Sequence, residues 1–223
     1  MRIFEHEKID IGYDDLKSET TTNGRRYVSP DGNSYPSVTT VLSLLSEAGI
    51  QEWRARVGEE EANRISTQAS GRGTKVHTII EKYLLNEDTS DFMPHIKQSL
   101  ANLKPILDTR VGKIFGIETA LYSKHLNLAG RCDCIAEFDG VISIVDWKTS
   151  RRPKTKDMIS NYFAQMAAYA IMFEERTGQP ITNIVVVMDV DGSEPLVFKE
   201  HRDNHTKLLL DTIKEYNRRK LFT

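Results

Sequence analysis

Alternating apolar and polar residues mark the middle of the chain as a set of β-strands. A period of two is typical of strands with one buried face, and the pattern predicts strands at about 114–123, 127–138 and 141–148. Asp139-Gly140 between the last two is turn chemistry and predicts a hairpin. The apolar run within Ile181–Val190 is typical of a strand buried on both faces, and another strand is expected at 195–200.

Apolar residues three and four positions apart predict helices around these strands. The expected helices cover Ser37–Leu45, about Ile50–Ala69, Thr74–Leu85, 94–110, Asp157–Thr177 and 205–220. Ser37, which follows Pro36, is expected to cap the first of them. Gly71 and Gly73 predict a kink or a restart between the second and the third, because glycine is a poor helix former.

The N-terminal region carries weaker signals. Arg25–Tyr35 predicts a small hairpin, and the polar residues 1–22 are expected to be loosely ordered. The chain has no repeat, low-complexity tract or interdomain linker. Its 223 residues therefore predict one α/β domain over 1–223, with a mixed central β-sheet flanked by helices and an N-terminal helical portion.

Three charged residues in the apolar strands carry the candidate chemistry. Asp146 follows the largely apolar run Val141–Val145, and Lys148 shares its face of the strand. Asp133 lies on the neighbouring strand of the expected hairpin. Two carboxylates and an ammonium group at the end of a sheet suit a Mg²⁺ and phosphate site. A structural Asp–Lys ion pair is the ordinary alternative.

Two pairs of helical residues could join this group. His77 and Glu81 lie four positions apart on one helix face, and a neutral imidazole is a common metal ligand. Gln165 and Tyr169 have the same spacing, and the Gln165 amide could hydrogen-bond a phosphate or orient Lys148. A buried core histidine and a buried amide beside a packed tyrosine explain the same residues without any ligand.

Charge and cysteine content narrow the class of protein. A formal net charge of −2 excludes a uniformly basic surface but allows a local basic groove, and basic residues do cluster, as at Arg25-Arg26. The only cysteines, Cys132 and Cys134, are poorly spaced for a disulfide and too few for a four-cysteine metal site. They predict buried thiols in a reducing compartment. No signal-peptide core and no bilayer-spanning run occur, so a cytoplasmic protein without membrane association is expected.

Short motifs in a fixed order point to a family. They are Arg72–Glu81, Glu118, Ala129–Asp133, Val145–Ser150 and Gln165–Tyr169, with further likeness at Tyr35–Ser43 and Trp53–Glu59. With these motifs the chain resembles the RecB-like branch of the PD-(D/E)XK nuclease superfamily, and within it the mitochondrial genome maintenance exonucleases and their phage and bacterial relatives. The likeness spans about residues 25–170. Relatives with an iron–sulfur cluster need four cysteines, so that subgroup does not fit.

The resemblance implies a restriction-endonuclease-like core at 71–200, an N-terminal portion at 1–70 that covers the site, and a C-terminal helix at 201–223. It implies that Mg²⁺ or Mn²⁺ is held by His77, Asp133, Asp146 and the Trp147 carbonyl. Catalysis is expected from the same three side chains together with Lys148 and Gln165. Lys148 would orient or deprotonate the attacking water, or stabilise the charged transition state.

The implied activity is exonucleolytic cleavage of DNA. Single strands are the expected substrate, and their binding would need a basic channel with aromatic stacking platforms. The candidate contacts are Glu118, Tyr169, Arg72, Lys75, Thr149, Arg151 and Trp53, with Lys154 and Tyr35 as further candidates. The family suggests work in DNA replication, repair or recombination, with proteins of those processes as partners, in a bacterial or phage-infected host cell.

Other readings stay open at this stage. The chain could be an endonuclease of the same superfamily, which circular DNA would distinguish from an exonuclease. It could also be a non-catalytic DNA-binding subunit, which would show no metal-stimulated cleavage. A nucleotide or sugar-phosphate hydrolase is a third class, but the sequence has no glycine-rich phosphate loop.

Overall fold

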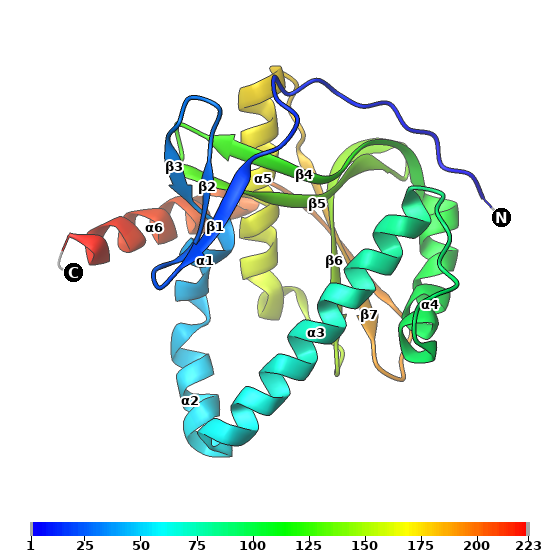
Figure 1. The fold of residues 1–223 in the computed structure, drawn as a ribbon, viewed down its shortest axis with the longest axis horizontal. Helices are drawn as coiled ribbons and strands as arrows, with labels where there is room; N and C mark the ends of the chain where they lie inside the picture. Colours follow the sequence, from blue (N-terminus) through cyan, green and yellow to red (C-terminus); the bar gives the residue numbers. More distant parts are fainter. Residues whose placement is uncertain (1, 222–223) are drawn as a thin grey trace.

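The main β-sheet has five strands, in the order β4-β5-β6-β7-β8 (Figure 1). In this computed structural model, residues 2–221 are described; Met1 and residues 222–223 lie outside the described residues. The strands are β4 (Val111–Ser123), β5 (Leu128–Phe138), β6 (Val141–Ser150), β7 (Asn183–Val190) and β8 (Leu196–His201). β6 and β7 run parallel, and the other neighbours are antiparallel. The predicted mixed sheet is confirmed.

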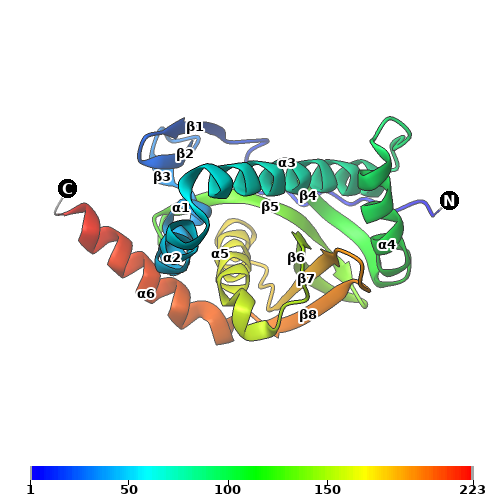
Figure 2. The ribbon, with the colours of Figure 1, turned by 90° about the horizontal axis from the view of Figure 1, so that it is seen from below.

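Helices cover both faces of this sheet (Figure 2). On one face, α3 (Glu59–Leu84) and α4 (Pro94–Arg110) enclose one hydrophobic cluster. On the other, α1 (Val38–Leu42), α5 (Ser160–Thr177) and α6 (Asp203–Lys220) enclose a second. Helix α5 is the crossover that the parallel pair β6–β7 requires. Both cysteines are buried free thiols, as predicted, with Cys132 in the α5 cluster and Cys134 in the α3 cluster.

A small second sheet lies at the N-terminus. It consists of β1 (Lys17–Thr21), β2 (Gly24–Val28) and β3 (Ser34–Pro36), so the predicted hairpin is confirmed and gains a third strand. The expectation that residues 1–22 are loosely ordered is wrong for residues 2–22, the part that the structure describes. Phe4, Ile11 and Leu16 are buried, and His6 forms a β-bridge with Ile114. These isolated apolar residues have no period. Contacts with distant elements, such as Phe4 with Tyr83 of α3 and His6 with Ile114 of β4, order the segment.

The helical stretch formed by α2 and α3 is interrupted at a different glycine from those predicted. Helix α2 (Glu47–Val57) ends at Gly58, whose φ of +86° favours glycine, and α3 then runs without interruption through Gly71 and Gly73. The helical structure predicted for 50–69 is confirmed except at Gly58, which divides it between α2 and α3, whereas the kink predicted at Gly71 and Gly73 is wrong. Each interior glycine costs about 1 kcal/mol, and burial of apolar residues in the C-terminal half of α3 offsets that cost. Consequently, the expected division between 1–70 and 71–200 falls inside one helix.

Other helix ends follow local chemistry more closely. The Ser37 hydroxyl accepts a hydrogen bond from the Thr40 N–H at 3.0 Å, which confirms the predicted cap of α1. The helix expected over Ser37–Leu45 is α1 followed by a 3₁₀ turn at Ser43–Leu45. A second 3₁₀ turn, Lys156–Ile159, precedes α5. No helix within residues 2–221 is long and apolar enough to cross a membrane.

Candidate active site

A cavity of about 460 Å³ gathers four of the five predicted catalytic residues, all except Asp146. Its walls come from α3, β4, β5, the end of β6, α5 and the small N-terminal sheet. The predicted residues that line it are His77, Glu81, Glu118, Asp133, Lys148, Gln165 and Tyr169. Residues more than 90 positions apart in the chain thus meet around one space, which is the arrangement that a reaction centre needs.

The acidic end of the cavity is a close group of three side chains. Single ligand atoms of His77, Glu118 and Asp133 all lie within 4.8 Å of one another, and we call these three residues the acidic group. His77 Nδ1 is 3.3 Å from Asp133 Oδ2, and the same oxygen accepts a hydrogen bond from the Trp147 N–H at 3.0 Å. That backbone bond from β6 fixes the Asp133 carboxylate, which in turn orients the imidazole.

The backbone itself aims Glu118 into this group. Glu118 lies between Ile117 and Thr119, which pair with Cys134 and Cys132, so it sits opposite Asp133 across β4 and β5. Its φ of +48° is in the left-handed region, where a residue other than glycine costs of order 1 kcal/mol. Burial, together with the negative charges of Asp133 and Glu81, raises the pKa of Glu118 to about 7.

Beside this group lies a buried ion pair. Asp146 is 2 % exposed, and its Oδ2 lies 2.5 Å from Lys148 Nζ. Within the described residues neither Asp146 oxygen has a hydrogen-bond donor in good geometry, so Lys148 is its one close partner. Burial raises the pKa of Asp146, and the Lys148 charge partly offsets this. Burial disfavours the Lys148 ammonium, but Asp146 and Asp133 outweigh that cost and raise its pKa.

An aromatic ring also lies close to Lys148. Lys148 Nζ lies 5.0 Å from the centroid of the Tyr162 ring, within the range of a cation–π interaction. Lys154 Nζ approaches the same ring at 5.4 Å and lies 3.5 Å from the Tyr162 hydroxyl. The sequence places Tyr162 one turn before Gln165, but only the fold shows that its ring contacts the lysine.

The donor set fits a divalent cation. Carboxylate oxygens and imidazole nitrogens are common ligands of such ions, and the buried Asp146 carboxylate nearby adds further negative charge. The grouping differs in detail from the expected one. Glu118, expected as a substrate contact, lies in the close group, whereas Asp146 lies outside it and contacts Lys148.

The α5 pair packs as a unit against β5. Gln165 Nε2 donates a hydrogen bond to the Tyr169 hydroxyl at 3.1 Å, and Tyr169 is buried. A Cβ atom on Gly130 would lie 2.7 Å from the Tyr169 ring, so this close approach requires glycine. The pair therefore fixes the distance between α5 and the strand that carries Asp133.

Several predicted substrate contacts lie elsewhere. Arg72, Thr149 and Arg151 line a separate cavity of about 310 Å³, and Arg72 forms ion pairs with Asp189 and Asp191. Lys75 is exposed on α3, and the half-buried Trp53 is on α2; neither lines the 460 Å³ cavity. Tyr35 is buried with its ring stacked on Tyr122, so its prediction as a base-stacking platform is wrong. The sequence predicted the hairpin that contains Tyr35, but it gave no sign that Tyr122 packs against the ring.

Comparison with known proteins gives a consistent picture. A family model described as the PD-(D/E)XK nuclease superfamily matches residues 47–218, a range that contains the acidic group, Lys148 and the α5 pair. Mitochondrial genome maintenance exonuclease 1 is 28% identical over 178 residues in Homo sapiens and 26% identical over 208 residues in Xenopus tropicalis. These matches cover 72% and 84% of this chain but 51% and 56% of the relatives, so the chain spans about half their length.

A crystal structure from Eubacterium rectale, assigned as an exonuclease, is also similar, with a TM-score of 0.46 and 14% identity over 67% of this chain and 66% of that one. That likeness is too slight to carry an argument. The family resemblance predicted from the motifs is confirmed by the sequence matches.

Proposed function

We propose that this chain, which belongs to the PD-(D/E)XK nuclease superfamily, is a divalent-metal-dependent deoxyribonuclease that digests single-stranded DNA from a free end. The observation that carries the proposal is the grouping of His77, Glu118 and Asp133 within 4.8 Å in the cavity that Lys148 also lines. Carboxylates, an imidazole and an ammonium group are the components that metal-assisted phosphodiester hydrolysis requires.

The acidic group would hold the cation, Mg²⁺ or Mn²⁺. Glu118 and Asp133 would supply carboxylate oxygens and His77 a ring nitrogen, with Asp146 adding negative charge from the adjacent strand position. When bound, the cation supplies a nucleophile at neutral pH and neutralises charge on the phosphate group. A pKa near 7 for Glu118 means that binding would compete with its protonation.

The protein's own cation would act on the phosphate. Lys148 keeps its proton because Asp146 and Asp133 stabilise the ammonium form. Asp146 and the Tyr162 ring both contact its Nζ, so little reorganisation is needed when charge develops. A preorganised charge of this kind stabilises the negative charge of a transition state by several kcal/mol.

The walls of the cavity support a free strand end as substrate. Helix α3 borders one side, and residues of β2 and the start of α1 border another. A single strand enters such a bounded space more easily by its end than by its middle. The names of the curated relatives, which are exonucleases of genome maintenance, support action on DNA in replication, repair or recombination, together with proteins of those processes.

The test compares end-labelled linear and closed circular single-stranded DNA in the presence of Mg²⁺, Mn²⁺ or chelator. The expected result is metal-stimulated release of nucleotides from linear DNA only, with the rate strongly reduced in Asp146→Asn. Equal cleavage of the circle would indicate an endonuclease of the same superfamily. Binding without metal-stimulated cleavage would indicate a non-catalytic DNA-binding subunit.

A further inference from the structure

Arg25 lies on the side of the cavity formed by the small sheet. It is on β2, its side chain is exposed, and it lines the same cavity as the acidic group. Its strand neighbour Arg26 points to the other face, where it donates to the Ser34 hydroxyl at 2.8 Å and to the Ser34 carbonyl at 2.7 Å. Of the adjacent arginines, only Arg25 lines the cavity.

The other cations of the cavity are already engaged. Lys148 pairs with Asp146, and Arg131 donates to the Asp15 carboxylate at 2.6 Å and to the Glu118 carbonyl at 2.5 Å. Across residues 2–221 no hydrogen-bond or ion-pair partner exists for the Arg25 guanidinium. Arginine presents several donors in a planar fork that matches phosphate. An unpaired guanidinium facing an acidic metal-type site is therefore suited to an external anion.

Hydrogen bonds to residues at the start of α1 hold the backbone of Arg25 in place. The Arg25 N–H donates to the Thr40 hydroxyl at 3.1 Å, and its carbonyl accepts from the Ser37 N–H at 2.8 Å. Gly24 has a φ of +99°, and a Cβ atom there would lie 2.4 Å from the Thr40 side chain, so the turn approaches α1 as closely as glycine allows. The position of Arg25 is thus fixed by α1.

The segment that fixes the Arg25 backbone also contacts β5, the strand that carries Asp133. Ser37 forms a β-bridge with Ala129, which lies on β5 four residues before Asp133. The small sheet therefore holds Arg25 in a defined position relative to the carboxylates. A fixed relative position is what a phosphate contact needs if it is to set the register of a strand in the site.

We propose that Arg25 binds a phosphate group of the DNA strand while another phosphate of that strand lies at the acidic group. The inference rests on the proposed function, because it takes the strand as the substrate of this cavity. The chemistry recognised is a nucleic-acid phosphate, which could be an internal diester or the phosphate at the strand end.

The test measures binding of labelled single-stranded oligonucleotides by fluorescence anisotropy in chelator, where cleavage is excluded. Arg25→Ala is expected to raise the Kd about tenfold, the effect of one charge-assisted hydrogen bond, and to reduce the salt dependence by about one phosphate contact. Arg25→Lys should recover part of the affinity. The matched control, Arg26→Ala, should bind within about twofold of wild type.

Two arms identify the phosphate. A loss of affinity confined to oligonucleotides with a terminal phosphate assigns Arg25 to the strand end, and an equal loss without that phosphate assigns it to an internal diester. Wild-type affinity in Arg25→Ala, or an equal loss in Arg26→Ala, overturns the proposal. Because no cleavage is measured, a protein that binds through Arg25 but never cuts DNA contradicts the proposed function and leaves this inference standing.

Discussion

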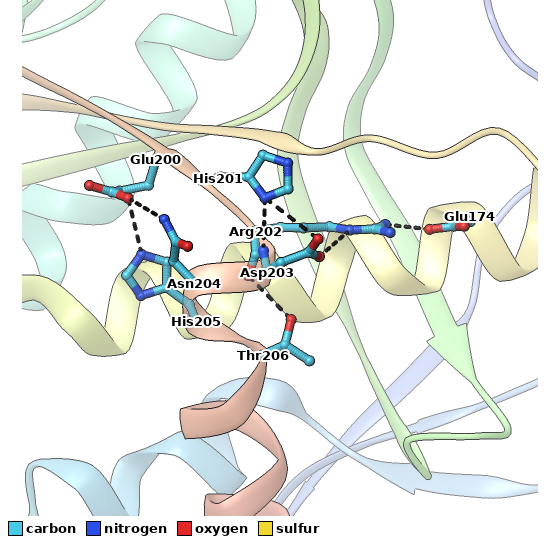
Figure 3. A network of polar contacts seen from close by, with 8 residues as sticks. All are labelled: Glu174, Glu200, His201, Arg202, Asp203, Asn204, His205 and Thr206. Atoms are coloured by element: carbon cyan, nitrogen blue, oxygen red, sulfur yellow. Dashed lines mark hydrogen bonds and ion pairs between the residues drawn. The ribbon is translucent and has the colours of Figure 1, made fainter.

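Two polar clusters in this molecule combine histidine with carboxylates, but they balance their charges differently. The first is the acidic group of the cavity. The second lies where β8 meets α6 and comprises Glu174, Glu200, His201, Arg202, Asp203, Asn204, His205 and Thr206 (Figure 3). In the second cluster each carboxylate has a cation: Arg202 pairs with Glu174 and Asp203, and Lys156 pairs with Glu200.

The group of His77, Glu118 and Asp133 lacks this balance. Asp133 contacts only the His77 ring and the Trp147 N–H among the described polar groups, and Glu118 has no ion pair within residues 2–221. Burial of a carboxylate without a cationic partner is costly. The carboxylates of the second cluster have such partners, so the requirements of folding do not explain their absence at Glu118 and Asp133. The contrast supports the proposal that the acidic group binds a cation from outside, whereas the ion pairs of the β8–α6 cluster contribute to the fold.

The largest expected effect is on catalysis, and it distinguishes the Lys148–Asp146 pair of the cavity from the Lys156–Glu200 pair of the second cluster. Lys148→Ala and Asp146→Asn should each lower kcat by about 10²–10³-fold or more, because they remove a preorganised charge of the transition-state site. Both variants should fold and bind single-stranded DNA in chelator much like wild type. Lys156→Ala, which removes the cation from Glu200, is the control and should keep its activity. Unfolding of both cavity variants, seen by circular dichroism, would favour a purely structural ion pair.

Added Mg²⁺ or Mn²⁺ should raise the Tm of the wild type and of a variant of the β8–α6 cluster, but not the Tm of variants of the acidic group. At a metal concentration 100 times Kd, binding to the native state contributes about 3 kcal/mol, which raises the Tm by about 5–10 °C for a chain of this size. His77→Ala and Glu118→Gln should lose most of this shift, because each removes a ligand. Glu200→Gln should keep it. A wild type whose Tm does not respond to Mg²⁺ or Mn²⁺ would contradict a metal site in the cavity.

The ring of Tyr162 offers a finer test of how Lys148 is held. Tyr162→Leu should lower kcat by about three- to thirtyfold, the range of one cation–π contact, with little change in KM. Tyr162→Phe keeps the ring and should restore most of the rate. Equal losses in both variants would assign the effect to the hydroxyl and its contact with Lys154 instead.

The smallest expected effect is a pH dependence at the second cluster. Burial against the Phe163 ring lowers the pKa of His205 from its ordinary value of 6.5, although Glu200 opposes this. The unfolded chain therefore binds this proton more readily, so stability should fall as the pH drops through about 6.5. A glutamine in place of His205 should remove that part of the Tm profile between pH 7 and 5. A profile unchanged by the substitution would show that other groups cause it.

Prediction from sequence succeeded where the signal was local. The three central strands, the hairpin turn at Asp139-Gly140 and the Ser37 cap follow from period and from short-range hydrogen bonding. It failed where packing outweighed propensity. Helix α3 continues through Gly71 and Gly73, and residues 2–16 are ordered by contacts with α3 and β4. Neither feature depends on residues close in sequence, so a local pattern does not reveal it.

The sequence alone determined the family, the strands that carry the site and the set of residue types available for chemistry, because motifs and alternation are properties of neighbouring positions. Only the tertiary structure decided how those residues combine: Glu118 joins His77 and Asp133, Asp146 holds Lys148, Arg72 is tied to Asp189, and Arg25 lines the cavity. The reason is physical. Ligation and ion pairing fall off within a few ångströms, and the distances between residues far apart in the chain are set by packing.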